Sequence, residues 1–115
     1  LPILGKSKNP VVVNVTSGLG SFAVVHDSSR IESKVNGLAY CSSKAAVTML
    51  TVQYAKALPH MRVNAVDPGY TATDFNHHSG PQTVEEGTDA MVQMANLGPD
   101  GPTGTFVDRH GAVGW

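Results

Sequence analysis

The chain has 115 residues and a formal net charge of -1, and charge of this size and balance gives no reason to expect a nucleic-acid or membrane-surface partner. No apolar run approaches the length of a membrane span, and the first residues lack the features of a signal peptide. Cys41 is the only cysteine, which excludes an internal disulfide and favours a reducing compartment, with the cytoplasm as the default.

The length suits one domain over residues 1–115. The chain begins with Leu1 in place of methionine, and its first four residues are typical of the end of a helix. We therefore expect a piece of a longer protein.

The first predicted element is a strand over residues 11–15 (VVVNV), a β-branched run typical of a strand buried on both faces. Residues 16–20 (TSGLG) predict the loop that ends it. Residues 26–36 are polar and aperiodic, which predicts a surface loop.

A long helix is predicted over residues 38–58, and Pro59 ends it because proline cannot continue the backbone hydrogen bonding. Its apolar residues fall on two stripes, so we expect it to pack against a sheet and against something else. The stripes are Val47, Leu50, Tyr54 and Leu58, and Ala45, Met49 and Val52.

The remaining elements continue the alternation of strands and helices. Residues 62–66 (RVNAV) predict a second strand, and the capping box of Thr83 and Glu86 predicts a helix that runs to about Leu97. Residues 104–108 predict a last strand, followed by a turn at 109–111. The order β-α-β-α-β predicts an α/β fold with a parallel, doubly wound sheet.

The first candidate chemical group is the pair Tyr40 and Lys44. Residues four apart in a helix lie on the same face, so the lysine ammonium can lie beside the phenol and favour its ionised form. Such a phenol can act as a general acid toward a carbonyl oxygen or as a base toward an alcohol. The same spacing is also typical of an ordinary helical pair, so it carries little weight alone.

Polar residues follow both predicted inner strands. Ser17 comes just after the first strand, and residues 67–73 (DPGYTAT) come directly after the second. If the two strands are parallel, these residues meet the tyrosine at one rim of the sheet, where α/β proteins bind their ligands.

Taken in order, these segments resemble the short-chain dehydrogenase/reductase family. The resemblance rests on VNVTSGLG, YCSSK, RVNAVDPGYTAT and the closing PTGTFVDRHGAVGW, and it covers nearly the whole chain. It implies the C-terminal, catalytic half of a Rossmann-like fold and an oxidoreductase that moves hydride between NAD or NADP and a carbonyl or alcohol substrate.

The resemblance also implies a role for each matching residue. Tyr40 would donate and accept the proton, and Ser17 would hydrogen-bond the substrate oxygen. Lys44 would hold the nicotinamide ribose and keep Tyr40 acidic. Ser17 is preferred over Thr16 and Ser21 because it precedes a glycine by three residues. The residues expected at the cofactor are Tyr40, Lys44, Pro68, Gly69, Tyr70, Thr71 and Thr73, with Thr73 on the carboxamide.

The phosphate-binding glycine loop, the first strands and the relay asparagine lie upstream of Leu1 in the family layout. We therefore expect the isolated chain to be inactive, to bind cofactor weakly or not at all, and to expose residues 11–15 as an unpaired apolar edge. Residues 18–23 (GLGSFA) imitate a dinucleotide fingerprint, but the following VVHDSS does not predict an amphipathic helix.

The segment from Ser17 to Tyr40 is longer than in compact members of the family. Its extra residues, about 24–35, are expected to form a loop near the pocket and beside the 38–58 helix. In the family this helix often packs in a dimer interface, and an insertion here can obstruct that interface, so a homo-oligomer through the helix is possible but not required. A solvated loop with no role is an equal alternative. The longer segment resembles carbonyl-reductase-like members and so favours NADP.

Other residues are weaker candidates. His77 and His78 lack a third metal ligand at useful spacing and fit a substrate loop better, so no metal is expected. Cys41 fits helix packing, Asp67 fits the turn, and Ser17 lacks the Gly-x-Ser-x-Gly elbow of a hydrolase. The alternative to an enzyme is a non-catalytic remnant or interaction module that keeps the fold.

Overall fold

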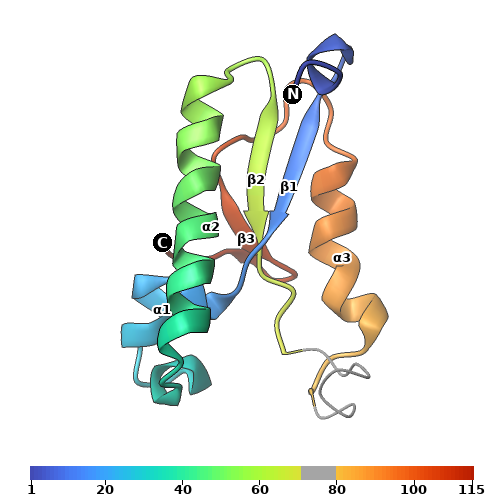
Figure 1. Cartoon of the computed structure of the whole chain (residues 1–115). Helices are drawn as coiled ribbons and strands as arrows, with labels where there is room; N and C mark the ends of the chain where they lie inside the picture. The colour runs from blue at the N-terminus through green and yellow to red at the C-terminus, as the bar shows by residue number, and fades with distance from the viewer. Residues whose placement is uncertain (71–79) are drawn as a thin grey trace.

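The computed structural model describes residues 1–70 and 80–115. It contains one four-stranded sheet in the order β1-β2-β3-β4, with α2 on one face and α3 on the other (Figure 1). The helices, the 3-10 turns (η) and the strands are, in order, η1 (Leu4–Lys6), β1 (Val11–Val15), η2 (Gly18–Gly20), α1 (Phe22–His26), η3 (Ile31–Lys34), α2 (Leu38–Ala57), β2 (Arg62–Val66), α3 (Val84–Ala95), β3 (Phe106–Asp108) and β4 (Gly111–Ala112).

The α/β architecture and the inner elements agree with the sequence. β1 pairs with β2 in parallel from Val11 opposite Arg62 to Val15 opposite Val66, and β2 pairs in parallel with β3. α2 ends at Ala57, one residue before the predicted end. α3 begins with the predicted capping box, in which the Glu86 amide donates to the Thr83 hydroxyl at 3.2 Å.

The C-terminal strand is shorter than predicted, and the sheet is not wholly parallel. Gly104 takes φ +71°, which lies outside the range of regular strand backbone, and the Thr105 amide donates to the Asn64 side chain. β3 therefore begins at Phe106. The predicted turn leads into β4, which pairs antiparallel with β3.

The segment between β1 and α2 contains helical turns where the sequence predicted loop. Ser21 caps α1 by accepting the Val24 amide, and the Phe22 amide donates to the carbonyl of Trp115. The first three residues of VVHDSS belong to α1, a five-residue helix that begins at Phe22, so this segment does not itself start a helix. The contact with the C-terminal tail stabilises α1 and is invisible to local periodicity.

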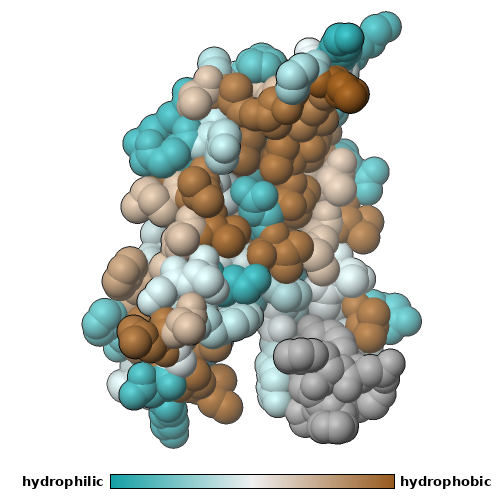
Figure 2. Space-filling view, viewed as in Figure 1, coloured by the Kyte–Doolittle hydropathy of each residue, from teal (hydrophilic) through white to brown (hydrophobic). Residues whose placement is uncertain are grey.

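β1 is a half-buried edge strand, not a strand buried on both faces. Among the described residues it pairs only with β2, and its last residue, Val15, is exposed. Helices α2 and α3 do contact it from the two faces. The space-filling view shows a hydrophobic band over β1 between the two helices (Figure 2), which is the unpaired apolar edge that the sequence predicted.

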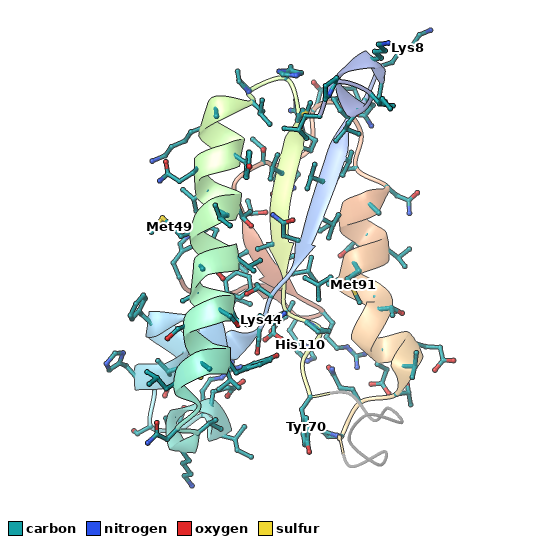
Figure 3. The ribbon with its side chains drawn as sticks, in the orientation of Figure 1. Lys8, Lys44, Met49, Tyr70, Met91 and His110 are labelled. Atoms are coloured by element: carbon teal, nitrogen blue, oxygen red, sulfur yellow. The ribbon has the colours of Figure 1, made fainter. Side chains whose placement is uncertain are left out.

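Helix α2 presents a different face to the sheet from the one its apolar stripes predicted. Thr48 and Thr51 are its buried residues, whereas Met49, Leu50 and Tyr54 are exposed. Figure 3 shows Met49 directed away from the sheet. Thr51 accepts from the Asn14 side chain at 3.0 Å, so hydrogen bonds rather than apolar packing decide which face is inward.

Helix α3 packs by apolar contact. Val66, Ala90 and Met94 form a buried cluster, which is surrounded by Val13, Met91, Leu97 and Val107. Figure 3 shows Met91 directed toward the sheet. In the part of the chain that the structure describes, no helix has the length and apolar character needed to cross a bilayer.

Candidate active site

A cavity of about 760 Å³ lies at the C-terminal ends of β1 and β2. Because these strands are parallel and in register at Val15 and Val66, the loops that follow them reach the same rim, as the sequence predicted. The first turn of α2 and the part of α3 from Val84 to Met91 complete the cavity. Its lining residues are Thr16, Ser17, Gly18, Leu19, Ile31, Glu32, Val35, Tyr40, Asp67, Pro68, Gly69, Tyr70, Val84, Gly87, Thr88 and Met91.

Tyr40 and Lys44 lie together at this rim. The Tyr40 side chain lines the cavity and is 51% exposed, so a ligand can reach it. The Lys44 ammonium lies 5.7 Å from the centroid of the Tyr40 ring and donates to the carbonyl of Val15 at 3.3 Å. This bond anchors the lysine at the end of β1 (Figure 3) and uses one of its three ammonium protons.

Ser17 lines the same cavity as Tyr40. It caps η2, where its hydroxyl oxygen accepts the Leu19 amide at 3.2 Å, and among the described residues its hydroxyl proton has no acceptor. The neighbouring hydroxyl of Thr16 is buried and bonded to the Lys44 carbonyl, and that of Ser21 is buried and donates to Gly114. Of the three hydroxyls, that of Ser17 is therefore the one free to donate to a ligand.

The turn after β2 forms another side of the cavity. Gly69 takes φ +74°, and the Gln82 side chain packs against it and donates to the carbonyl of Pro68. Pro68, Gly69 and Tyr70 all line the cavity. Two further residues expected at the cofactor, Thr71 and Thr73, lie outside the described residues.

Asp67 belongs to this turn, as predicted, but it also holds two loops together. Its carboxylate is only 6% exposed, accepts the Gly69 amide at 2.8 Å and is also stabilised by the Gly18 amide. Burial raises the pKa of Asp67, and the negative charges of Asp108 and Glu32 add to that effect. The carboxylate thus links the turn after β2 to the loop that carries Ser17.

The sequence did not single out the residues that build the outer wall. Ile31, Glu32 and Val35 border the cavity from the segment before α2, and Val84 and Met91 border it from α3. The expectation that residues 24–35 lie near the pocket is confirmed. The unusual length of the segment between Ser17 and Tyr40 was the available signal, and it does not say which side chains turn inward.

The glycines of the GLGSFA segment serve packing. A Cβ on Gly20 would lie 2.6 Å from the backbone of Lys44, so this glycine permits η2 to approach α2. A Cβ on Gly18 would meet the carboxylates of Asp67 and Glu32. These two carboxylates would repel a pyrophosphate. Residues 18–23 are therefore not a dinucleotide-binding loop, and the reason is charge and not the missing amphipathic helix that the sequence suggested.

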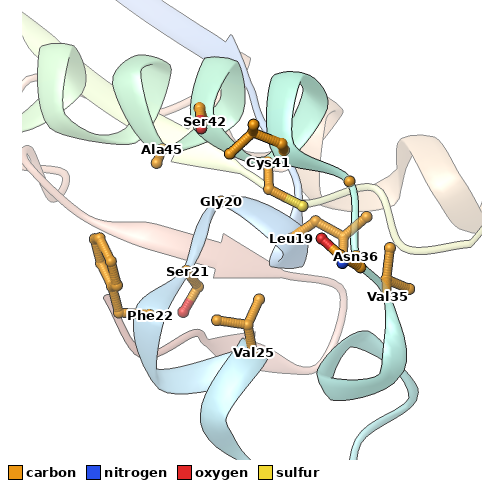
Figure 4. A pocket seen from close by; sticks show the side chains of 12 residues that line it. Leu19, Gly20, Ser21, Phe22, Val25, Val35, Asn36, Cys41, Ser42 and Ala45 are labelled. Atoms are coloured by element: carbon orange, nitrogen blue, oxygen red, sulfur yellow. The ribbon is translucent and has the colours of Figure 1, made fainter.

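A second hollow of about 290 Å³ lies on the other side of η2 (Figure 4). Leu19 and Val35 line both hollows, and the half-buried Cys41 directs its sulfur into the second one. No group of three or more metal-binding side chains occurs among residues 1–70 and 80–115, and His77 and His78 lie outside them.

The described residues fit the nicotinamide end of a dinucleotide cofactor. Lys44 has two ammonium protons that its bond to Val15 does not use, and Pro68, Gly69 and Tyr70 border a cavity of ligand size beside Tyr40. They offer no comparable binding site for the pyrophosphate, since the Gly18–Gly20 turn faces carboxylates and the backbone of α2.

Comparison with known proteins places these features in a family. Residues 1–83 match the model of the short chain dehydrogenases. The chain is 32% identical over 141 residues to salutaridine reductase from Papaver bracteatum, covering 94% of this chain and 45% of that protein. It is 32% identical over 146 residues to (-)-isopiperitenone reductase from Mentha piperita, covering 98% of this chain and 46% of that protein.

Solved structures agree in fold. The structure of salutaridine reductase from Papaver somniferum matches with a TM-score of 0.74 at 32% identity, covering 91% of this chain and 47% of that one. A carbonyl reductase from chicken fatty liver matches with a TM-score of 0.79 at 24% identity, covering 99% and 49%, and this likeness supports the fold alone. The chain spans about half the length of the curated relatives it matches.

Proposed function

The chain belongs to the short-chain dehydrogenase family, and we propose that it carries the catalytic half of an NAD(P)-dependent oxidoreductase acting on a carbonyl or alcohol substrate. The nicotinamide cofactor supplies or accepts the hydride when it is bound. The residues of this chain bind and orient the substrate and move the proton.

Tyr40 is the proposed proton donor toward the substrate oxygen in reduction and the acceptor in oxidation. The Lys44 ammonium lies against the Tyr40 ring and keeps two protons for the ribose hydroxyls. Ser17 donates its free hydroxyl proton to the substrate oxygen and orients it. The observation that carries the proposal is that Ser17 and Tyr40 line one cavity, with the Lys44 ammonium beside the phenol.

The turn after β2 is the proposed nicotinamide pocket. Pro68, Gly69 and Tyr70 already border the cavity, and Thr71 and Thr73 would continue it, with Thr73 on the carboxamide. NADP is favoured over NAD because the Ser17-to-Tyr40 segment is long. Comparing kcat/KM for NADPH and NADH in the full-length protein tests this choice, and a preference for NADH contradicts it.

The proton-transfer role is tested by Tyr40→Phe in the full-length protein. We expect kcat to fall at least ~100-fold, because the variant has no proton to give, while cofactor binding measured by calorimetry is retained. Tyr54→Phe is a matched control, since Tyr54 is an exposed tyrosine on the same helix and does not line the cavity. Normal turnover of Tyr40→Phe, or an equal loss in both variants, contradicts the assignment.

The second function to weigh is a non-catalytic remnant that keeps the fold. The sequence upstream of Leu1 separates the two proposals, since a glycine-rich loop after a strand supports the enzyme. For the 115-residue chain alone, calorimetry should detect no clear NADPH binding, because the described residues offer no pyrophosphate site. A clear affinity for NADPH would contradict the proposal that this chain supplies the catalytic residues but no pyrophosphate site.

Helix α2 is the proposed surface for a homo-oligomer. Its outward face exposes large apolar side chains, namely Leu38, Met49, Leu50 and Tyr54. Sedimentation of the full-length protein with and without Leu50→Glu tests this, and an unchanged oligomeric state contradicts it. A cytoplasmic location is proposed on the single, unpaired Cys41.

A further inference from the structure

The large apolar side chains around the cavity are open to it from separate elements. Ile31 is 72% exposed and Val35 47% exposed on the segment before α2, and Val84 is 51% exposed at the start of α3. Exposed aliphatic side chains that share one cavity are suited to enclose an apolar ligand body. Because Leu19 and Val35 also line the second hollow, the apolar surface continues beyond the first.

The charges at the cavity are acidic. Among the described lining residues, Glu32 and Asp67 carry carboxylates, and none is lysine, arginine or histidine. Two neighbouring cations already have partners. Arg30 donates to both oxygens of Glu32, at 2.8 and 3.2 Å, and the Lys44 ammonium lies over the Tyr40 ring and donates to the carbonyl of Val15.

The Glu32 carboxylate keeps its charge at neutral pH. Its hydrogen bonds with Arg30 hold the pKa of Glu32 below its ordinary value. Glu32 lines the cavity and its partner Arg30 does not, so this ion pair turns its negative end toward the wall, where it is screened less than a fully solvated charge.

We infer that the substrate is a bulky, largely apolar carbonyl or alcohol compound without an anionic group, and that Glu32 is a specificity-determining residue of the site. This inference rests on the proposed function and deepens it. An apolar body would lie between Ile31, Val35 and Val84, with its oxygen at Ser17 and Tyr40. Among the described lining residues, a carboxylate or phosphate on that body would face Glu32 and Asp67 and would find no lysine, arginine or histidine to pair with.

A matched pair of aldehydes tests the charge selectivity in the full-length protein. The probes are para-formylbenzoate and its methyl ester, which share the reacting carbonyl and differ in the negative charge. We expect kcat/KM for the ester to exceed that for the acid by at least about tenfold, because like charges repel in a partly desolvated site. Equal use of both, or a preference for the acid, overturns the inference.

Glu32→Gln removes the charge with little change of shape and leaves Arg30 unpaired. We expect the KM for the acid to fall and the ester-to-acid ratio of kcat/KM to shrink several-fold, with chemical denaturation serving as the check that the variant is folded. Glu85→Gln is the matched control, because Glu85 is exposed on the first turn of α3 and does not line the cavity. An unchanged ratio in Glu32→Gln, or an equal change in Glu85→Gln, overturns the role of Glu32.

The apolar wall is tested separately with Ile31→Asn. We expect a higher KM for a two-ring ketone such as decalone and an unchanged KM for acetone, which is too small to reach the wall. Ile3→Asn is the control, since Ile3 is an exposed isoleucine outside the cavity. An unchanged KM for decalone overturns the assignment of this wall.

Binding without turnover separates failure of this inference from failure of the proposed function. Saturation-transfer NMR of the two aldehydes with the full-length protein should give a signal for the ester and little for the acid, and Ile31→Asn should weaken it. If neither aldehyde is reduced but this binding pattern holds, the proposed chemistry fails and the selectivity stands. If the acid binds as well as the ester, or neither binds, the selectivity is overturned.

Discussion

The α3 side of the sheet is packed with aliphatic side chains, whereas the α2 side is held by hydroxyl and amide groups. On the α3 side, Val66, Ala90 and Met94 form a buried apolar cluster. On the α2 side, the Thr16 and Thr48 hydroxyls hydrogen-bond at 3.0 Å, and Asn14 donates to Thr51.

The two interfaces contribute differently because their forces differ. Apolar burial is roughly proportional to area and carries little directional information. Hydrogen bonds between buried groups fix distance and angle, and a bond left unmade is expensive. The α2 interface therefore sets where the helix lies along β1, and with it the positions of Tyr40 and Lys44 beside Ser17. The α3 interface stabilises the fold mainly through the burial of apolar side chains.

The largest effect is expected from Met94→Ala on the α3 side. Removing this buried side chain leaves a cavity and should lower the free energy of unfolding by about 2–5 kcal/mol, measured by chemical denaturation. Val92→Ala, an exposed position on the same helix, should change it little. Similar losses in both variants would mean that α3 is not packed as described.

A smaller but more localised effect is expected from Thr51→Val on the α2 side. The variant keeps the shape but strands the Asn14 amide, which should cost about 1–3 kcal/mol, and Thr51→Ser should recover much of it by restoring the hydroxyl. Full-length Thr51→Val should also lose turnover beyond its loss of stability. If the valine variant is as stable as the wild type, hydrogen bonding does not hold this interface.

The helix cap gives a still smaller effect. Thr83→Ala removes the hydroxyl that accepts the Glu86 amide at the start of α3, and we expect a loss of about 1 kcal/mol in thermal or chemical unfolding. Thr88→Ala, on the same helix but away from its end, provides the comparison. An equal loss of stability in both variants would show that the capping hydroxyl contributes no more than another hydroxyl on the helix.

Asp67→Asn is expected to change the free energy of unfolding least at any single pH, but it should change how that free energy depends on pH. The folded chain raises the pKa of Asp67, so between the ordinary and the raised value it binds more protons than the unfolded chain. Wild-type stability should therefore fall relative to Asp67→Asn as pH rises from about 4 toward 7.

This slope is measured as the difference between the two proteins in unfolding experiments across the pH range. Contributions from groups with lowered pKa values that do not interact with Asp67, such as Glu86, have the opposite sign and are common to both proteins, so they cancel in the difference. Asp89→Asn, an exposed aspartate on α3, is the control. A difference that does not change with pH would contradict the buried charge.

Local pattern was sufficient for the inner strands and both long helices. The β-branched runs before Thr16 and Asp67, proline after α2 and the capping box at Thr83 are short-range signals, and the structure has elements at each of them. The rim shared by Ser17, Tyr40 and Pro68 also followed from sequence, because parallel strands bring the loops after them to one edge.

Local pattern failed where a distant contact decides the conformation. α1 depends on Ser21 and on the C-terminal tail, and the start of β3 depends on the Asn64 side chain. The outer wall of the cavity was missed for the same reason, since Ile31 and Val84 are far apart in sequence and only the fold brings them to the same cavity.

The sequence by itself determined the alternation of strands and helices, the family and the set of chemical groups, since each depends on neighbours within a few residues. Only the tertiary structure decided which face of α2 turns inward and which charges border the cavity. The apolar stripes of α2 predicted that Leu50 and Tyr54 would face inward. The Asn14 amide in β1 and the Thr16 hydroxyl just after it needed hydrogen-bond partners, however, and Thr51 and Thr48 provide them. Burying those polar groups unpaired would have been worse than leaving the leucine in water.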